Sequence, residues 1–340
     1  MLNLSKEERE TVPERETLVH HIVPVNPGSL KAEADKLLKQ GVDSYQTGQY
    51  EVAIKFSQQS LALYQKLQDP QGEGQALGNL GAIHYALKDY TKAVDYSQRR
   101  LDIARDTGDL RGEGQGLGNL GNAYRHLKDH DKAITYSQRN LLVARELGDK
   151  RAEMAALNNL GLAYKALKDY VSAIDHERQS LEIAREIGDQ QVEGQILKNL
   201  GNAYYALGDY LQAADYYEQR LKLAQEGKDR RVESQILKSL GSTYHALGDY
   251  RRAISYFQQR LEIARLIKDA RGEEQILGYL GVVYEALGDY EKAVEAYEQR
   301  LMVARQLKDP QVERQSLGSL QVACYAIGNY AKAMEYSLSK

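Results

Sequence analysis

The amino-acid sequence repeats with a period of 40 residues, and this period constrains the fold more than any other feature. The dipeptide Leu-Gly recurs at this spacing as Leu160-Gly161, Leu200-Gly201 and Leu240-Gly241. Fixed periods of roughly 20 to 50 residues are typical of solenoids, in which each repeat buries its apolar face against its neighbours. We therefore expect one elongated domain, although a chain of 340 residues more often divides into globular domains.

Each repeat is predicted to form two helices. Apolar and small residues of the first helix are three or four positions apart, at Leu197, Leu200, Gly201, Tyr204 and Leu207. The second helix shows the same spacing at Tyr210, Ala213, Leu221 and Ala224. Asp189 and Asp209 precede the two helices, where aspartate is suited to cap the free amides of the first turn.

A glycine inside the first helix of most repeats, such as Gly201, is a further feature of the pattern. Glycine in a helix interior costs about 1 kcal/mol relative to alanine, so a packing gain must offset it. We expect the missing side chain to let the second helix approach closely, with Tyr204 and Ala213 interlocking at the contact.

The repeat pattern divides the chain into an N-terminal arm, residues 1–28, and a repeat array, residues 29–340. The array holds seven repeats between residues 31 and 310 and a truncated eighth at 311–340. In the arm, the apolar strip from Leu18 to Val25 is expected either to cap the first repeat or to occupy the groove of the array. The eighth repeat stops a turn short, which suggests a fragment, or a domain or second copy that docks after Lys340.

Composition excludes several classes of function. The formal net charge is -3, which provides no basic field for nucleic acid. Cys324 is the single cysteine and fits a reducing compartment. No run of about 18 apolar residues is present, so the sequence predicts no membrane span and no signal peptide. We expect a cytoplasmic protein that binds neither nucleic acid nor membrane.

Three patterns imitate chemical sites. The glycine-rich segment from Gly112 to Gly118 lacks the preceding strand and the Gly-Lys-Ser/Thr of a phosphate loop, and it coincides with the helix start of one repeat. The histidines have no metal-ligand spacing; His84 and His130 occupy tyrosine positions of the repeat and His20-His21 are a tandem pair. Cys324 also replaces a tyrosine, without a histidine in register. The sequence predicts no enzyme, no cofactor and no metal site.

The repeat resembles a known family. Leu197-x2-Leu200-Gly201-x2-Tyr204, followed by Ala213-x3-Tyr217, is similar to the tetratricopeptide repeat, with Leu197 in place of the usual tryptophan and Gly-Asp in place of the usual terminal proline. The long period, against about 34 residues in the common form, resembles the long-helix subtype of Pins/LGN adaptors and of bacterial tetratricopeptide signalling arrays. The resemblance implies an all-α solenoid of stacked helical hairpins that forms a right-handed superhelix with a concave groove.

The face opposite the apolar stripe of the first helices lines the groove in the resembling family, and amides follow it from repeat to repeat. The predicted groove residues of this kind are Gln75, Asn79, Gln115, Asn119, Asn122, Asn159, Gln195, Asn199, Asn202 and Gln235. A carboxamide both donates and accepts hydrogen bonds, so such a series is able to pair with the backbone of an extended peptide. The alternative is that these amides only solvate a helix face, although Glu or Lys would form a more stable helix there.

The predicted groove also has a basic edge and an apolar end. The basic edge contains Arg125, Lys165, Lys198 and Lys238, and the apolar end begins at Tyr279. These residues favour a protein or peptide partner that carries acidic and apolar side chains.

We therefore expect a non-catalytic scaffold that binds a peptide segment of a partner protein in the concave groove. The alternative is the sensory or regulatory region of a larger signalling enzyme whose catalytic domain lies beyond this chain. A third possibility is a self-assembling protein that stacks through its uncovered end. The full-length gene sequence distinguishes the second from the first, and light scattering at several concentrations distinguishes the third.

Overall fold

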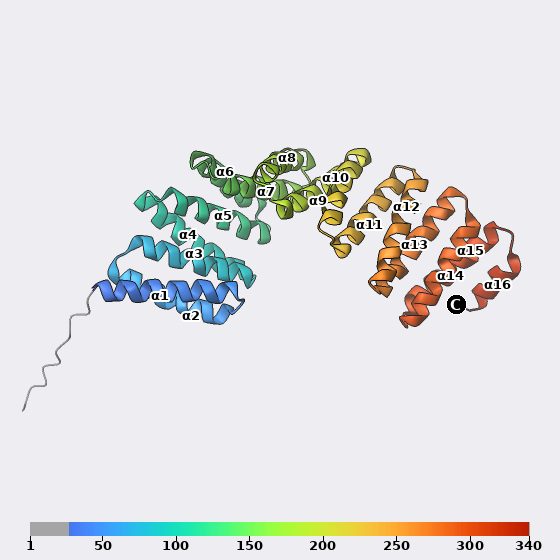
Figure 1. Cartoon of the computed structure of the whole chain (residues 1–340), viewed down its shortest axis with the longest axis horizontal. Coiled ribbons are helices and arrows are strands. Elements are labelled where there is room, and N and C mark those ends of the chain that lie inside the picture. Colours follow the sequence, from blue (N-terminus) through green and yellow to red (C-terminus); the bar gives the residue numbers. More distant parts are fainter. Residues whose placement is uncertain (1–26, 340) are drawn as a thin grey trace, which may run out of the picture.

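Residues 27–339 are described by the computed structural model, and they form sixteen helices and no strand. The helices succeed one another along an arch with α1 at one end and α16 at the other (Figure 1). Their bounds are α1 (Pro27–Gln46), α2 (Tyr50–Leu67), α3 (Pro70–Ala86), α4 (Tyr90–Thr107), α5 (Leu110–His126), α6 (His130–Glu146), α7 (Lys150–Ala166), α8 (Tyr170–Ile187), α9 (Gln190–Leu207), α10 (Tyr210–Glu226), α11 (Arg230–Ala246), α12 (Tyr250–Leu266), α13 (Ala270–Leu287), α14 (Tyr290–Gln306), α15 (Pro310–Ala326) and α16 (Tyr330–Leu338). The predicted all-α solenoid of helical hairpins is confirmed.

The arm that was predicted at residues 1–28 falls almost entirely outside the described part of the chain. Residues 1–26, which include Leu18 to Val25 and His20-His21, are not among the described residues, and neither is Lys340. Pro27 and Gly28 already belong to α1. Within residues 27–339, every helix is too short or too polar to cross a membrane.

Each helix packs against the next one along the chain, and the first helices of neighbouring repeats also touch. α1 contacts α3, α3 contacts α5, α5 contacts α7, and α7 contacts α9. In the middle of the arch, α5, α7, α9 and α11 lie on the inner side, while α6, α8 and α10 lie on the outer side (Figure 1). The side chains that first helices direct away from the core therefore face the hollow of the arch.

Aspartates set the start of almost every helix. The backbone N–H of Gln212 donates to Oδ1 of Asp209 at 3.1 Å, and the backbone N–H of Val192 donates to Asp189 in the same way. The preceding helix ends in a left-handed residue, glycine at Gly208 with φ 82° and lysine at Lys88 with φ 62°. Both boundaries predicted from the sequence are confirmed, because capping depends on a few neighbouring residues.

We expect Asp209→Ala to lower the free energy of unfolding by about 1 kcal/mol, because the amide of Gln212 loses its acceptor. Asp209→Asn is the matched control, since Asn329 caps α16 through the same contact with the backbone N–H of Lys332. Urea denaturation followed by circular dichroism measures both variants. Equal losses for alanine and asparagine would contradict the capping role.

The core follows the predicted stripe except at its end. Leu197, Leu200 and Ala213 are fully buried. Leu207 was expected in the stripe but is 46% exposed, whereas Ala203 is buried. Leu207 lies at the last residue of α9, beyond the reach of the neighbouring helix, so that the final turn of the apolar spacing meets solvent.

The glycine inside the first helix faces one residue of the second helix. A Cβ atom on Gly201 would lie 2.5 Å from Cε1 of Tyr217, and a Cβ on Gly241 would lie 2.5 Å from Cε1 of Phe257. The close approach expected there is confirmed, but the contact is made by Tyr217 rather than by Tyr204 and Ala213. Tyr204 instead stacks on Tyr216, with ring centroids 5.3 Å apart.

We call the residue that meets this glycine the facing residue. It changes along the chain, from serine in the first three hairpins through glutamate in the fourth to an aromatic residue in the fifth, sixth and seventh. The facing residues are Ser57, Ser97, Ser137, Glu177, Tyr217, Phe257 and Tyr297, opposite Gly41, Gly81, Gly121, Gly161, Gly201, Gly241 and Gly281. The N-terminal hairpins therefore lack the ring that fills this position in the C-terminal ones.

Candidate functional site

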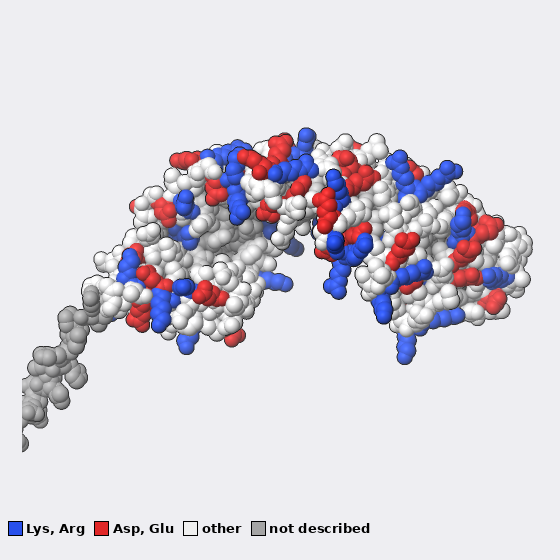
Figure 2. Space-filling view, in the orientation of Figure 1, with Lys and Arg blue, Asp and Glu red and all other residues white. Residues whose placement is uncertain are grey.

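A large hollow lies in the N-terminal half of the array and has a volume of about 860 Å³. It extends from α1 across α3 and α5 to α7, and the same part of the arch is recessed in the left half of Figure 2. Six of the predicted groove residues line it: Gln75, Asn79, Gln115, Asn119, Asn122 and Asn159. Amides from three successive repeats thus face one shared space.

Two polar residues that second helices contribute to this hollow were missed at the sequence level. Arg100 of α4 and Asn140 of α6 come from second helices, yet they line the hollow. A Cβ on Gly78 would lie 1.9 Å from Nη1 of Arg100, and a Cβ on Gly118 would lie 3.0 Å from Nδ2 of Asn140. Glycines in the first helices therefore admit these side chains, and a glycine followed 22 residues later by a polar residue is the signal that would have found them.

Arg100 is held by uncharged oxygen atoms. Its Nη1 donates to the carbonyl oxygen of Gly74 at 3.1 Å, its Nε donates to that of Gly112 at 3.4 Å, and its Nη2 contacts the side-chain oxygen of Gln115. Burial lowers the pKa of the Arg100 guanidinium. The floor of the hollow therefore holds a half-buried positive charge that carbonyl and amide oxygens surround.

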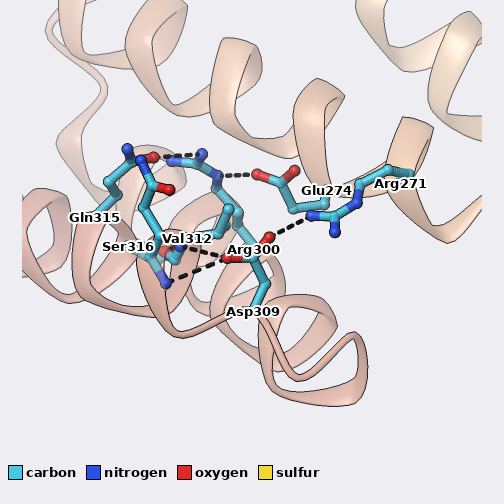
Figure 3. Close-up of polar contacts among 8 residues, drawn as sticks. Arg271, Glu274, Arg300, Asp309, Val312, Gln315 and Ser316 are labelled. Carbon is cyan, nitrogen blue, oxygen red and sulfur yellow. Dashed lines mark hydrogen bonds and ion pairs between the residues drawn. The ribbon is translucent and has the colours of Figure 1, made fainter.

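The arginine at the same repeat position in the seventh hairpin is neutralised instead. Nε of Arg300 lies 2.8 Å from Oε1 of Glu274, and Nη2 of Arg300 donates to Gln315 at 3.3 Å (Figure 3). Glu274 occupies the repeat position of Gly74. Arg271 forms a separate ion pair with Asp309 (Figure 3). An anionic ligand would therefore meet less competition at Arg100 than at Arg300.

Some predicted amides are engaged within the protein. Asn199 is only 3% exposed and donates from Nδ2 to Oε1 of Glu177 at 2.9 Å. Asn202 accepts a hydrogen bond from the hydroxyl of Tyr217 at 2.7 Å. Asn79 donates to Oγ of Ser57 at 2.8 Å. These amides satisfy facing residues, a contact between helices that the spacing within one helix does not reveal.

The remaining predicted residues lie away from the large hollow. Tyr279 lines a separate hollow of about 260 Å³ together with Val282, Tyr297 and Arg300. Neither hollow is lined by the other eight: Arg125, Lys165, Gln195, Lys198, Asn199, Asn202, Gln235 and Lys238. The structure thus brings together amides of α3, α5 and α7 along the large hollow. On α9, Nδ2 of Asn199 donates to Oδ1 of Asn158 on α7 at 3.4 Å.

Basic side chains project into the open side of the arch beneath α9 and α11 (Figure 2). Burial lowers the pKa of Lys165, and the nearby charge of Lys198 lowers it further while Glu177 raises it. Nζ of Lys238 lies 5.5 Å from the ring centroid of Tyr279. Nη2 of Arg125 lies 3.1 Å from Nε2 of His126.

Three of the segments and residues that imitate chemical sites have structural positions in the helices and the core. Gly112 to Gly118 lies inside α5, where the backbone N–H of Gly112 donates to the cap Asp109. His84 is 5% exposed and stacks on Tyr96. Cys324 is fully buried, and burial raises its pKa. Residues 27–339 contain no group of three or more His, Cys, Asp or Glu side chains placed to hold a metal ion.

Comparison with family models gives matches along most of the chain. Models described as tetratricopeptide repeat match residues 33–106, 113–186, 189–265 and 277–311. No curated protein matches the sequence.

Solved structures of similar shape include the apo form of RapI, which is 16% identical at a TM-score of 0.58, with 81% of this chain and 99% of that chain covered. A signal transduction ATPase with numerous domains and a tetratricopeptide repeat sensor, from Pyrococcus horikoshii, is 18% identical at a TM-score of 0.63. That match covers 94% of this chain but 53% of the ATPase, so the chain spans about half of its length. Aspartyl phosphate phosphatase F from Bacillus subtilis is 14% identical at a TM-score of 0.54, and the match covers 84% of this chain and 74% of that chain. At these identities the likeness concerns the fold.

Proposed function

The chain belongs to the tetratricopeptide repeat family, and we propose that it is a non-catalytic scaffold that binds an extended peptide segment of a partner protein in the hollow between α1 and α7. The family supports a role in protein interaction. We choose a peptide as the ligand because of the residues that line the hollow. We also propose that the protein is cytoplasmic.

The single observation that carries the proposal is the series of amides that line one hollow. Asn119, Asn122 and Asn159 present donors and acceptors to one hollow, and a peptide backbone offers one donor and one acceptor at each residue. Gly78, Gly114 and Gly118 line the same hollow, where they leave room for the protein's own side chains of Arg100, Val143 and Asn140. A volume of about 860 Å³ lies within the range of ordinary ligand sites.

Charge defines the partner further. Arg100 lines the hollow without a carboxylate at the position that Glu274 occupies next to Arg300. Basic side chains also extend along the open side of the arch (Figure 2). A peptide with an acidic side chain near Arg100, followed by apolar residues toward Tyr279, fits this distribution of charge.

Binding is tested by selecting peptides from a random displayed library with the whole chain and titrating them by calorimetry. Asn119→Ala with Asn122→Ala should weaken the selected peptides at least tenfold, because the peptide backbone loses two amide partners. Both side chains are only half-buried, so we expect a melting temperature within about two degrees of the wild type, as for substitutions outside the core.

Gln58→Ala with Gln59→Ala is the matched control, since both amides are exposed on α2 and neither lines the hollow. Peptides that bind the Asn119 and Asn122 double variant as well as they bind the control would place the peptide site elsewhere.

A second candidate function is that of a sensor segment within a larger signalling protein. The observation that favours it is the similarity to the ATPase from Pyrococcus horikoshii, whose name includes a tetratricopeptide repeat sensor and of which the match covers about half. The sequence of the complete gene decides this point, because a catalytic domain after residue 340 would be evident in it.

A further inference from the structure

The facing residue of the second hairpin leaves a slot beside the large hollow. The slot has a volume of about 150 Å³ and lies between Gly81, Ser97, Asn119, Asn122, Tyr45 and Tyr85. Ser97 takes the position that an aromatic ring fills in the fifth, sixth and seventh hairpins. The slot is therefore the space of a missing ring, with its glycine retained opposite.

A polar group of the slot lacks a partner. Oγ of Ser97 is buried and makes no hydrogen bond within residues 27–339, and the whole residue is 0% exposed. The equivalent Ser57 differs, because its Oγ accepts a hydrogen bond from Asn79 at 2.8 Å. A buried hydroxyl without a partner is costly, and a ligand atom in the slot would satisfy it.

Resting on the proposed peptide binding, we propose that this slot receives the phenol ring of a tyrosine in the bound peptide. The protein's own rings provide the template. Tyr217 lies over Gly201 with its hydroxyl donating to Asn202 at 2.7 Å, and the ring of Tyr297 lies over Gly281. Asn122 is the repeat equivalent of Asn202 and lines the slot, so an amide is present for the hydroxyl of the ligand.

The size and polarity of the slot select tyrosine among side chains. A cavity of about 150 Å³ is sufficient for a six-membered ring. Ser97, Asn119 and Asn122 give the slot a polar lining. A phenylalanine would fill the same volume but leave Oγ of Ser97 unpaired, and a leucine would lack both the flat shape and the polar atom.

The slot is tested with N-acetyltyrosinamide, N-acetylphenylalaninamide and N-acetylleucinamide, each titrated into the whole chain and followed through the side-chain amide resonances of Asn119 and Asn122. We expect the tyrosine amide to bind with a dissociation constant on the order of 1 mM, in line with the affinity of small ligands. The phenylalanine amide should bind at least threefold more weakly, and the leucine amide should not saturate. Equal binding of the three amides would overturn the proposal.

Ser97→Phe fills the slot as Phe257 fills the same position over Gly241, so binding of the tyrosine amide should disappear while the helical content stays unchanged. Undiminished binding would overturn the proposal. If Ser97→Phe does not fold, Ser97→Ala decides, because it keeps the slot open and removes only the hydroxyl. The preference for the tyrosine amide over the phenylalanine amide should then shrink, because one of the polar partners is lost, and an undiminished preference would contradict the slot.

The same library separates this inference from the proposed function. Selected peptides that depend on Asn119 and Asn122 but show no tyrosine at a fixed position, and that bind Ser97→Phe normally, would refute the slot and leave peptide binding intact. Specific binding of the tyrosine amide with no selected peptides would support the slot and refute the peptide scaffold.

Discussion

Glu177→Gln is expected to stabilise the protein strongly at pH 8 and much less at pH 5. Glu177 is the facing residue of the fourth hairpin and is 2% exposed. Its Oε1 accepts a hydrogen bond from Asn199, whereas Oε2 is buried without a partner within residues 27–339. Burial raises the pKa of this carboxyl group to about 8, although Asn199 and Lys165 act in the opposite direction.

The direction in which the free energy of unfolding changes with pH follows from the pKa of Glu177 in the unfolded and in the folded state. In the unfolded chain the carboxyl group ionises near pH 4.5, and in the folded protein it keeps its proton until about pH 8. Between these values the folded state binds the additional proton, so the free energy of unfolding falls as pH rises. From pH 5 to pH 8 the loss amounts to about 3 to 4 kcal/mol, from roughly 1.4 kcal/mol for each pKa unit. Glutamine remains neutral and avoids this loss.

Thermal unfolding of the wild type and of Glu177→Gln, followed between pH 5 and pH 8.5, measures the effect. Glu182→Gln is the matched control, because Glu182 lies on the same helix and is exposed. The difference in melting temperature between Glu177→Gln and the wild type should grow with pH, while the control shows no such trend. A difference that stays constant with pH would show that Glu177 is ionised in the folded protein throughout this range.

Phe257→Ala should lower the free energy of unfolding by about 3 to 5 kcal/mol, the usual loss for a large aromatic side chain in a packed core. Phe257 is 1% exposed, covers Gly241, and stacks on Tyr279 with ring centroids 5.4 Å apart. Chemical denaturation measures the loss. Because a repeat array is stabilised mainly by contacts between neighbouring repeats, hydrogen exchange should increase most in α11, α12 and α13.

Ser97→Ala is the matched control for this variant, since it changes the same repeat position in a hairpin that has no ring there. We expect its stability to equal or slightly exceed that of the wild type, because a buried hydroxyl without a partner is removed. A loss below about 1 kcal/mol for Phe257→Ala would mean that neighbouring side chains close over the vacated space and that the ring is not needed for packing.

The period and the capping residues were sufficient to predict the helices. Asp189 and Asp209 act on amides two or three residues away, so the sequence contains the whole interaction. The buried position of Asn199 was harder to predict from the sequence. Its burial depends on Glu177, which lies on another helix, and a helical wheel describes only one helix at a time.

The site was predicted only in part, because a helical wheel describes a single helix and the site is lined by several. Asn119 and Asn122 were assigned to the groove from the periodicity of the first helices, and the structure places them along the large hollow. Arg100 and Asn140 enter that hollow from second helices, across glycines of the first, so no spacing within one helix identifies them. The slot beside Ser97 was not predicted. Its sequence signal is the change of the facing residue from serine through glutamate to aromatic residues along the repeats.

The exchange of serine for a ring at one position of an unchanged backbone has an evolutionary consequence. Repeats of this kind arise by duplication, and a copy of the second hairpin inserted among the later ones would carry its vacancy along. A single codon change from tyrosine to serine would open such a vacancy, and the reverse change would close it. The array is therefore able to gain or lose a slot of this kind by point mutation, without redesign of its helices.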